Sequence, residues 1–264
     1  MNTRDLGTDN RFPPGTFTPR PVPARPAAML RAQIAMELKL LLRHGEQLLL
    51  TMFIPITLLV GITLIPIGDL GDTRVATVLP AVMMVAVMST AFTGQAIAVG
   101  FDRRYGALKR IGATALPRWG IIGGKSGAVL VVVALQSLLL GAIGVALGWR
   151  PDAAGLALGA VVIAVGTVTF AAMGLLLGGT LRAEIVLALA NIVWFVLLGV
   201  GSLVMLRGDV PQLWIDAARV LPSGAMAHAL DAALAGSLDW ISLVVLALWA
   251  AVSAAAAVRF FRFT

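Results

Sequence analysis

The chain has 264 residues, of which 59% are hydrophobic and 12% are charged, and its formal net charge is +7. A soluble domain carries about 25% charged residues, so this composition argues against a soluble enzyme. With no cysteine and two histidines, disulfide frameworks and thiolate metal sites are excluded and a histidine metal centre is disfavoured. In a chain this apolar, we assign the positive charge to a membrane surface and not to nucleic acid.

The first 26 residues are rich in proline and poor in large apolar side chains, which predicts a disordered tail over 1–26. The segment 27–46 then predicts an interfacial helix. Its apolar residues recur at helical spacing, with charged residues opposite: Leu30, Ile34, Leu38 and Leu41. Glu37 lies at the edge of this apolar arc, so a cytosolic extension of the first span is the alternative.

Six later stretches are long and uncharged enough to cross a bilayer, which needs about 20 apolar residues each. They are Gln47–Ile67, Val75–Gly100, Ile121–Gly148, Ala153–Leu181, Ile185–Leu206 and Trp240–Val258. We therefore predict an all-α polytopic membrane protein, with residues 47–264 forming one six-span domain. With both termini in the cytoplasm, 16 of the 20 Lys and Arg and 6 of the 13 Asp and Glu lie on the inner side. This bias favours that orientation.

The connection between the second and third spans, residues 101–120, is the most informative segment. Asp102 suits the first turn of a short helix, Lys109 and Arg110 suit its last turn, and Gly112 closes it. Such a helix, with apolar residues among charges, is suited to docking into a groove on a partner. The alternative is a basic loop that fixes topology and contacts anionic lipid.

This segment resembles the permease subunits of ABC-2 type transporters, with the daunorubicin-resistance type nearest. The family pattern is an acidic-Arg pair, Gly-x-Leu, a Thr-Pro-Leu element and Gly-Lys opening the third span. The matching residues are Asp102, Arg103, Gly106, Leu108, Thr114, Leu116, Gly124 and Lys125, with Ile111 where Leu is commoner. The chain departs from the pattern at Arg104, where a second acid is frequent, and at Ala115 and Pro117, where the proline is shifted.

The resemblance implies the membrane subunit of an ATP-driven exporter in the cell membrane, moving a hydrophobic drug-like or lipid substrate. It implies three kinds of partner: two copies of an ABC ATPase, a second permease copy that is identical or related, and membrane lipid. ATP and Mg²⁺ are expected in the ATPase. This chain itself is expected not to be an enzyme and to hold no cofactor. The segment 101–120 couples to the ATPase through these residues: Asp102, Arg103, Arg104, Tyr105, Gly106, Leu108, Lys109, Arg110 and Ile111. Tyr105, Leu108 and Ile111 are the expected apolar anchors in the partner.

The cores of the six predicted spans contain no ionisable residue, which argues against a proton-coupled antiporter. Of the uncharged polar residues, Gln95, Gln136 and Asn191 are candidates for a substrate pathway; hydrogen bonding between helices is the alternative.

The segment 211–235 is patterned as two short amphipathic helices. The resemblance implies re-entrant helices there that close the pathway, with an outer gate at Leu213, Trp214, Met226 and His228. Interfacial anchoring by Trp214 and Trp240 is the alternative.

Motifs of a nucleotide-binding protein and of a membrane protease are incomplete in this sequence. Gly124-Lys125-Ser126 lacks the leading Gly of a phosphate loop, since Trp119 stands there, and Lys125 is expected to snorkel. Ser223 lacks the motif of a serine intramembrane protease and is expected to cap a helix. A secondary transporter or a membrane scaffold without an ATPase is the alternative function.

Overall fold

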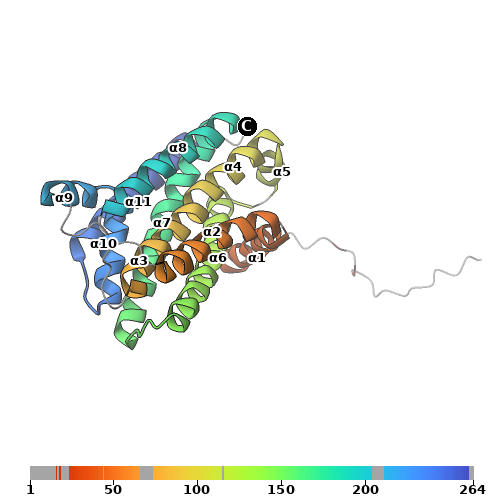
Figure 1. Cartoon of the computed structure of the whole chain (residues 1–264). Helices are drawn as coiled ribbons and strands as arrows, with labels where there is room; N and C mark the ends of the chain where they lie inside the picture. The colour runs from red at the N-terminus through yellow and green to blue at the C-terminus, as the bar shows by residue number, and fades with distance from the viewer. Residues whose placement is uncertain are drawn as a thin grey trace, which may run out of the picture.

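The computed structural model describes residues 16, 18, 24–43, 45–65, 74–114, 116–203 and 211–261. Most of the predicted tail 1–26 lies outside these residues. The regular secondary structure of the described part is helical (Figure 1). In chain order its helices are α1 (Pro26–Arg43), α2 (Gly45–Leu64), α3 (Arg74–Val87), η1 (Met88–Gly94), α4 (Gln95–Arg104), α5 (Ala107–Gly112), α6 (Arg118–Ala146), α7 (Ala153–Thr180), α8 (Ala183–Ser202), α9 (Gln212–Val220), α10 (Pro222–Leu234) and α11 (Trp240–Phe260).

The prediction of an all-α polytopic membrane protein is confirmed. Five described segments are long and apolar enough to cross a membrane: Arg74–Arg104, Trp119–Ala146, Ala153–Thr180, Ala183–Ser202 and Trp240–Phe260. The apolar part of α2, Thr51–Leu64, is shorter. These six helices fall on the six predicted stretches, because runs of apolar residues in a bilayer satisfy their backbone only as helices.

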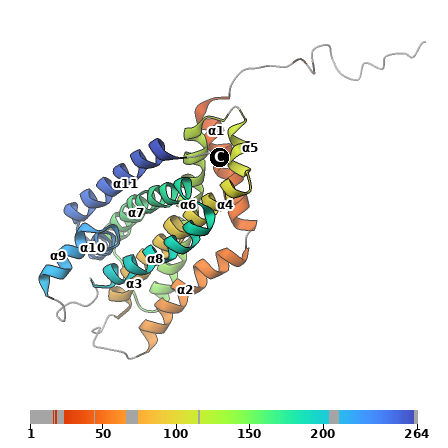
Figure 2. The ribbon, with the colours of Figure 1, turned by 90° about the horizontal axis from the view of Figure 1, so that it is seen from above.

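The second span is the centre of the bundle. It is the continuous run of α3, η1 and α4, and 78% of its most apolar stretch is buried, against 22–50% in the other four spans. It packs against α2, α6, α7 and α8, and in Figure 2 the ribbon of α3 and α4 lies between those of α2 and α7. The middle of this span is a π-helical turn, η1, and such turns are frequent at functional sites.

Two glycines of α7 allow that helix to contact the second span at backbone distance. A Cβ atom at Gly174 would lie 2.7 Å from the carbonyl oxygen of Phe92, and one at Gly178 would lie 2.4 Å from that of Ala96. Both separations are too short for any side chain. The four-residue spacing of Gly174 and Gly178 in the sequence therefore serves close helix packing.

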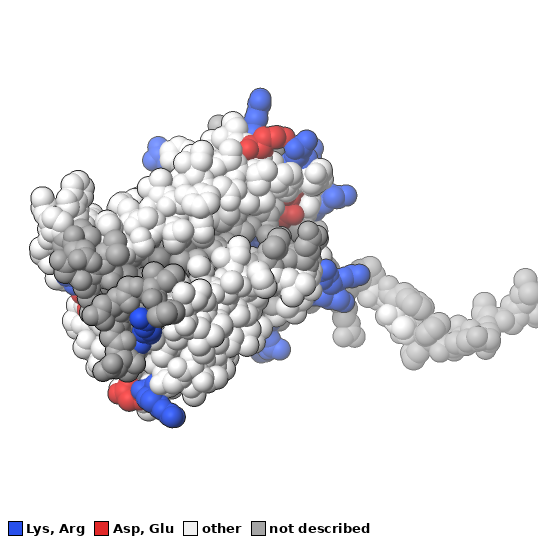
Figure 3. Space-filling view, viewed as in Figure 1, with Lys and Arg blue, Asp and Glu red and all other residues white. Residues whose placement is uncertain are grey.

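The bundle has two ends. The "α5 end" consists of α5, the last turn of α4, the first turns of α6, the α7–α8 connection and Phe261; the "α9 end" consists of α9, the start of α10 and the start of α11 (Figure 1). In Figure 3 most of the visible Lys and Arg side chains gather on the side where Figure 1 places α1, α4 and α5.

The two short helices before the last span differ in burial. α10 is inserted among the long helices, and Met226 and Leu230 are fully buried. α9 exposes Leu213 and Trp214. The expectation that Ser223 caps a helix is wrong: α10 begins one residue earlier at Pro222, so Ser223 lies inside the first turn, where its hydroxyl makes no capping bond.

At the α9 end, Asp239 joins α9 to the start of α11. Its carboxylate caps α11, accepting a bond of 2.6 Å from the Ser242 hydroxyl, and it pairs with Arg219 of α9. Burial on its own raises the pKa of Asp239, but the hydrogen bonds from Ser242 and Arg219 outweigh burial and hold this pKa below its ordinary value. Asp239 is therefore a carboxylate at neutral pH.

Candidate functional site

A buried ion cluster lies at the α5 end and joins three helices. Lys125 of α6 places its Nζ atom 3.0 Å from Oε2 of Glu37 on α1 and 2.7 Å from Oδ2 of Asp102 on α4. The side chains of Lys125 and Glu37 are 9% and 8% exposed. The expectation that Lys125 snorkels to the membrane surface is therefore wrong. We call these three residues the charge cluster. Two carboxylates and one ammonium leave it with a formal charge of −1.

Helix α1 presents polar residues to the protein. Its buried residues are Gln33 and Glu37, and the Nε2 of Gln33 donates a 2.9 Å bond to Oε1 of Glu37. The predicted apolar arc is only half-buried, and Met36 and Leu40 are exposed. Glu37, at the edge of that arc in the sequence, turns inward because Lys125 lies opposite. A buried lysine with a partner carboxylate decides the rotation of α1 where apolar spacing does not.

Close contact between α1 and α6 depends on Gly124, the residue before Lys125. A Cβ atom at Gly124 would lie 2.1 Å from Cγ of Gln33. The glycine therefore allows α1 to approach closely enough for Glu37 to reach the ammonium of Lys125.

The connection after the second span differs from the expected short helix. Asp102 is not in the first turn of that helix, because α4 continues through Asp102 to Arg104. Gly106 then adopts a φ of +71°, which breaks the helix at a residue without a Cβ atom, and α5 runs over Ala107–Gly112. Asp102 thus belongs to the central span, and α5 is a separate six-residue helix.

The two arginines that follow Asp102 contact the connection between α7 and α8. Nη1 of Arg103 donates to the carbonyl oxygens of Gly178 and Leu181, at 3.1 and 3.0 Å. These carbonyls lie at the carboxyl end of α7, where a cation is favoured. Arg104 pairs with Glu184 at 2.5 Å on the surface. Arg103 therefore has an internal structural role in addition to the predicted coupling role.

Leu108 fixes α5 to the bundle. It is fully buried among Val99, Ile121 and Leu175, with Ile111 and Phe261 packed around them. Leu108 therefore does not reach into a partner as an anchor residue, and Ile111 is half-buried by the same cluster. Both residues attach α5 to the chain's own helices, since burying a leucine gains about 1.5–3 kcal/mol.

The turn before α5 and the opposite face of α5 are open to solvent. Tyr105 is 68% exposed, and Lys109 and Arg110 are exposed beside it. The guanidinium of Arg104 lies 5.9 Å from the Tyr105 ring, a cation–π distance. We call Arg104, Tyr105, Lys109 and Arg110 the α5 surface. It is basic, it carries one large aromatic ring, and the buried Leu108 attaches it to the bundle.

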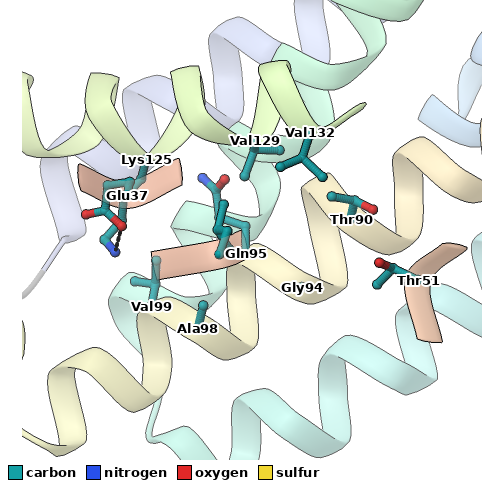
Figure 4. Close-up of a pocket in the computed structure, with 11 residues that line it drawn as sticks. Glu37, Thr51, Thr90, Gly94, Gln95, Ala98, Val99, Lys125, Val129 and Val132 are labelled. Carbon is teal, nitrogen blue, oxygen red and sulfur yellow. Dashed lines mark hydrogen bonds and ion pairs between the residues drawn. The ribbon is translucent and has the colours of Figure 1, made fainter. Parts of the chain in front are cut away.

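A cavity of about 60 Å³ begins at the charge cluster and runs toward the middle of the bundle (Figure 4). Its lining comes from α1, α2, the second span and α6: Glu37, Leu41, Thr51, Thr90, Gly94, Gln95, Ala98, Val99, Lys125, Val129 and Val132. Gln95, one of the predicted pathway residues, donates its Nε2 to the carbonyl oxygen of Ala171 at 3.3 Å. Among the described residues, its Oε1 has no hydrogen-bond partner.

The other two predicted pathway residues lie elsewhere. Gln136 is buried, accepts a 2.9 Å bond from the Thr90 hydroxyl and donates to the backbone of Thr51, so it holds helices together beside the cavity. Asn191 is exposed on α8 and bonds to the Leu187 carbonyl of its own helix. The structure therefore does not group the three side chains in one site.

The predicted outer-gate residues are also in different surroundings. Met226 is fully buried and packs against α7 where Gly166 has no side chain, while His228 of the same helix is half-buried. Leu213 and Trp214 are 75% and 61% exposed on α9. Across the described ranges, no group of three His, Asp or Glu side chains forms a metal site.

Sequence reasoning missed the charge cluster. Two signals were present: Lys125 stands within an otherwise apolar stretch, and Glu37 interrupts the apolar arc of α1. Intramembrane or interfacial charges that violate a pattern usually have partners, so the two violations could have been paired. That Asp102 joins them depends on α4 continuing past Gly100.

The fold and these sites define a multi-pass helical membrane protein. The family model for ABC-2 type transporters matches residues 30–236, and the chain belongs to this family. It is accordingly a transmembrane permease domain, without an ATPase domain, that serves as the membrane component of an ABC transporter and partners with an ABC ATPase. No curated protein matches the chain.

Proposed function

We propose that the chain is the membrane subunit of an ATP-driven exporter and that the α5 surface receives the motion of a separate ATPase, which holds the ATP and Mg²⁺. The observation that carries this proposal is the contrast between the buried side and the exposed side of α5 and the turn before it. Leu108 is fully buried, whereas Tyr105, Lys109 and Arg110 are exposed. A helix fixed on one side and presenting an aromatic and basic face on the other is suited to transmit a push from a partner.

The contacts behind α5 support transmission to the spans. Asp102 lies four residues before Gly106 on the central span and pairs with Lys125 of α6, and Arg103 bonds to the end of α7. A displacement of α5 therefore acts on α4, α6 and α7 together. Helices packed together and joined by ion pairs move as rigid bodies between a few discrete arrangements when one of them is displaced. They do not deform continuously.

The orientation is part of the proposal: the α5 end faces the cytoplasm, both termini lie there, and the membrane is the cell membrane. The excess of Lys and Arg over Asp and Glu in the segments assigned to that side supports it. Residues 101–120 are then available to a cytoplasmic ATPase.

The assembly we propose has two permease copies, identical or related, and two ATPase subunits. Large apolar side chains remain exposed along the spans, among them Phe53, Phe195 and Leu248. These faces suit contact with lipid and with a second permease. We propose a hydrophobic drug-like or lipid substrate, as in the daunorubicin-resistance type, with α9 and α10 closing the pathway at the outer side through Leu213, Trp214, Met226 and His228.

The α5 surface provides the test. The chain is co-expressed with candidate ABC ATPases of its own organism, and co-purification of an ATPase is measured for the wild type, for the double variant Lys109→Glu with Arg110→Glu, and for Arg150→Glu, an exposed arginine outside the α5 surface. We expect the double variant to lose the ATPase and Arg150→Glu to retain it, because charge reversal acts on rim contacts of the interface.

Three outcomes would contradict the proposal. If the double variant recovers as much ATPase as the wild type, the α5 surface does not bind the ATPase, and its positive charge serves only to fix the membrane topology. Transport by the chain without any ATPase would favour a secondary transporter, and absence of both transport and ATPase binding would favour a membrane scaffold.

A further inference from the structure

The cavity beside the charge cluster has the features of a binding site. It is charged at one end, at Glu37 and Lys125, and apolar along the wall formed by Val129 and Val132 (Figure 4). A cavity of about 60 Å³ is large enough for the polar end of a molecule but not for a whole drug-sized one, since such ligands occupy pockets of roughly 300–1,000 Å³. An occupant must therefore be small or extend beyond the cavity.

The charge of the site favours a cation. Glu37 and Asp102 both pair with Lys125, so one negative charge is left uncompensated by these pairs. Glu37 is buried, and the energy of a buried carboxylate depends strongly on nearby positive charge. An anion, or the phosphate of a lipid, would have to compete with Glu37 and Asp102, because both already pair with Lys125, the cation that lines the cavity.

An unused acceptor lies in the same cavity. Gln95 is 4% exposed, its Nε2 donates to Ala171, and no donor among the described residues reaches its Oε1. In Figure 4 the side chain of Gln95 extends from its helix into the space between Lys125 and Val129. A buried carbonyl oxygen without a hydrogen-bond donor is energetically unfavourable. A ligand that donates a hydrogen bond to this oxygen removes that penalty, which favours binding.

We infer that this cavity binds a lipophilic amine: its ammonium donates to Oε1 of Gln95 beside the carboxylate of Glu37, and its carbon chain leaves along Val129 and Val132. The two polar groups come from different helices, α1 and α4, so occupancy joins the interfacial helix to the central span. Binding needs only this chain. It goes beyond the proposed function, and its failure would leave the ATPase partnership untouched.

The experiment uses the full chain in nanodiscs of phosphatidylcholine. Saturable binding of tritiated dodecylamine is measured, with excess unlabelled dodecylamine to subtract partition into lipid, and displacement is compared for dodecanol and dodecanoate. We expect dodecylamine to displace the label at least tenfold better than dodecanol, and dodecanoate not at all.

Three variants test the residues. Gln95→Leu removes the acceptor and is expected to weaken dodecylamine binding about tenfold or more. Ala98→Leu fills the cavity and abolishes binding without changing a polar group. Glu37→Gln keeps an acceptor for Gln33 but neutralises the site, so the preference for amine over alcohol falls.

Asn191→Leu is the matched control, an amide-to-leucine change on the exposed face of α8 outside the cavity. Each variant is first shown to elute as a single species. The inference is overturned if Gln95→Leu and Ala98→Leu bind like Asn191→Leu, or if dodecanoate displaces the label as well as dodecylamine does.

Discussion

Asp102 and Lys125, 23 residues apart in the chain, form a 2.7 Å ion pair that fastens the end of the central span to the start of α6. Glu37 holds the same ammonium from α1 at 3.0 Å. A single lysine thus joins three helices at the end of the bundle that carries the α5 surface. The cluster links α1 and α6 to the central span, whose last turn precedes α5.

Removing the lysine should cost more than removing a surface lysine. Lys125→Met leaves Glu37 buried without its ion partner, and breaking a buried pair in this way typically costs about 3–5 kcal/mol. We expect a clearly lower melting temperature in detergent. Lys39→Met, an exposed lysine of α1, is the control and should melt like the wild type. Equal melting of the two variants would mean that the charge cluster does not hold the helices together.

The contact between α7 and the second span should reject even one methyl group. A Cβ atom at Gly178 would lie 2.4 Å from the carbonyl oxygen of Ala96, so Gly178→Ala forces the helices apart at a cost of about 1–3 kcal/mol. Gly199→Ala is the matched control, because nothing lies within 4 Å of its added Cβ and alanine favours the helix. Melting curves compare the two; a neutral Gly178→Ala would show that this close approach is not required.

Variants on the buried and the exposed side of α5 and the turn before it should separate stability from partner binding. Leu108→Ala leaves a hole in a fully buried cluster, and such changes cost about 2–5 kcal/mol. Tyr105→Ala removes an exposed ring, so stability should stay near that of the wild type while capture of the ATPase falls. Thermal melting and co-purification are measured on both variants. A melting loss in Tyr105→Ala as large as in Leu108→Ala would contradict the assignment of the two faces.

Stability at the α9 end should depend on acid pH through Asp239. Hydrogen bonds from Ser242 and Arg219 outweigh burial and lower the pKa of this carboxyl. A lowered pKa in the folded state stabilises the fold at pH values above the ordinary Asp value of about 3.9, and this contribution is lost as the pH falls through the lowered value. Melting temperatures of the wild type should therefore drop on acidification below about pH 4.

Asp239→Asn should lack that part of the pH dependence, because asparagine still caps α11 but does not ionise. Its melting temperature at pH 7 should be lower than that of the wild type, and the two curves should converge at low pH. Asp216→Asn, at an exposed position of α9, serves as the control. Parallel curves for Asp239→Asn and the wild type down to pH 3 would exclude this role for Asp239.

The sequence by itself determined the helical class and the places of the spans. Apolar runs of about 20 residues have one stable form in a bilayer, and Val75–Gly100 and Ala153–Leu181 were located from that rule alone. It also identified residues 101–120 through Asp102, Arg103, Gly106 and Leu108. These features could be predicted because each one depends only on residues that are close together in the chain.

Tertiary structure decided which side of each element faces the protein. Leu108 and Tyr105 both read as anchors in the sequence, yet one is fully buried and the other mostly exposed, because α5 folds back on Val99 and Ile121. Glu37 turns inward against the spacing of its helix because Lys125, 88 residues away, supplies the opposite charge. Partners separated by this distance in the chain come together only through packing, and no local pattern encodes that packing.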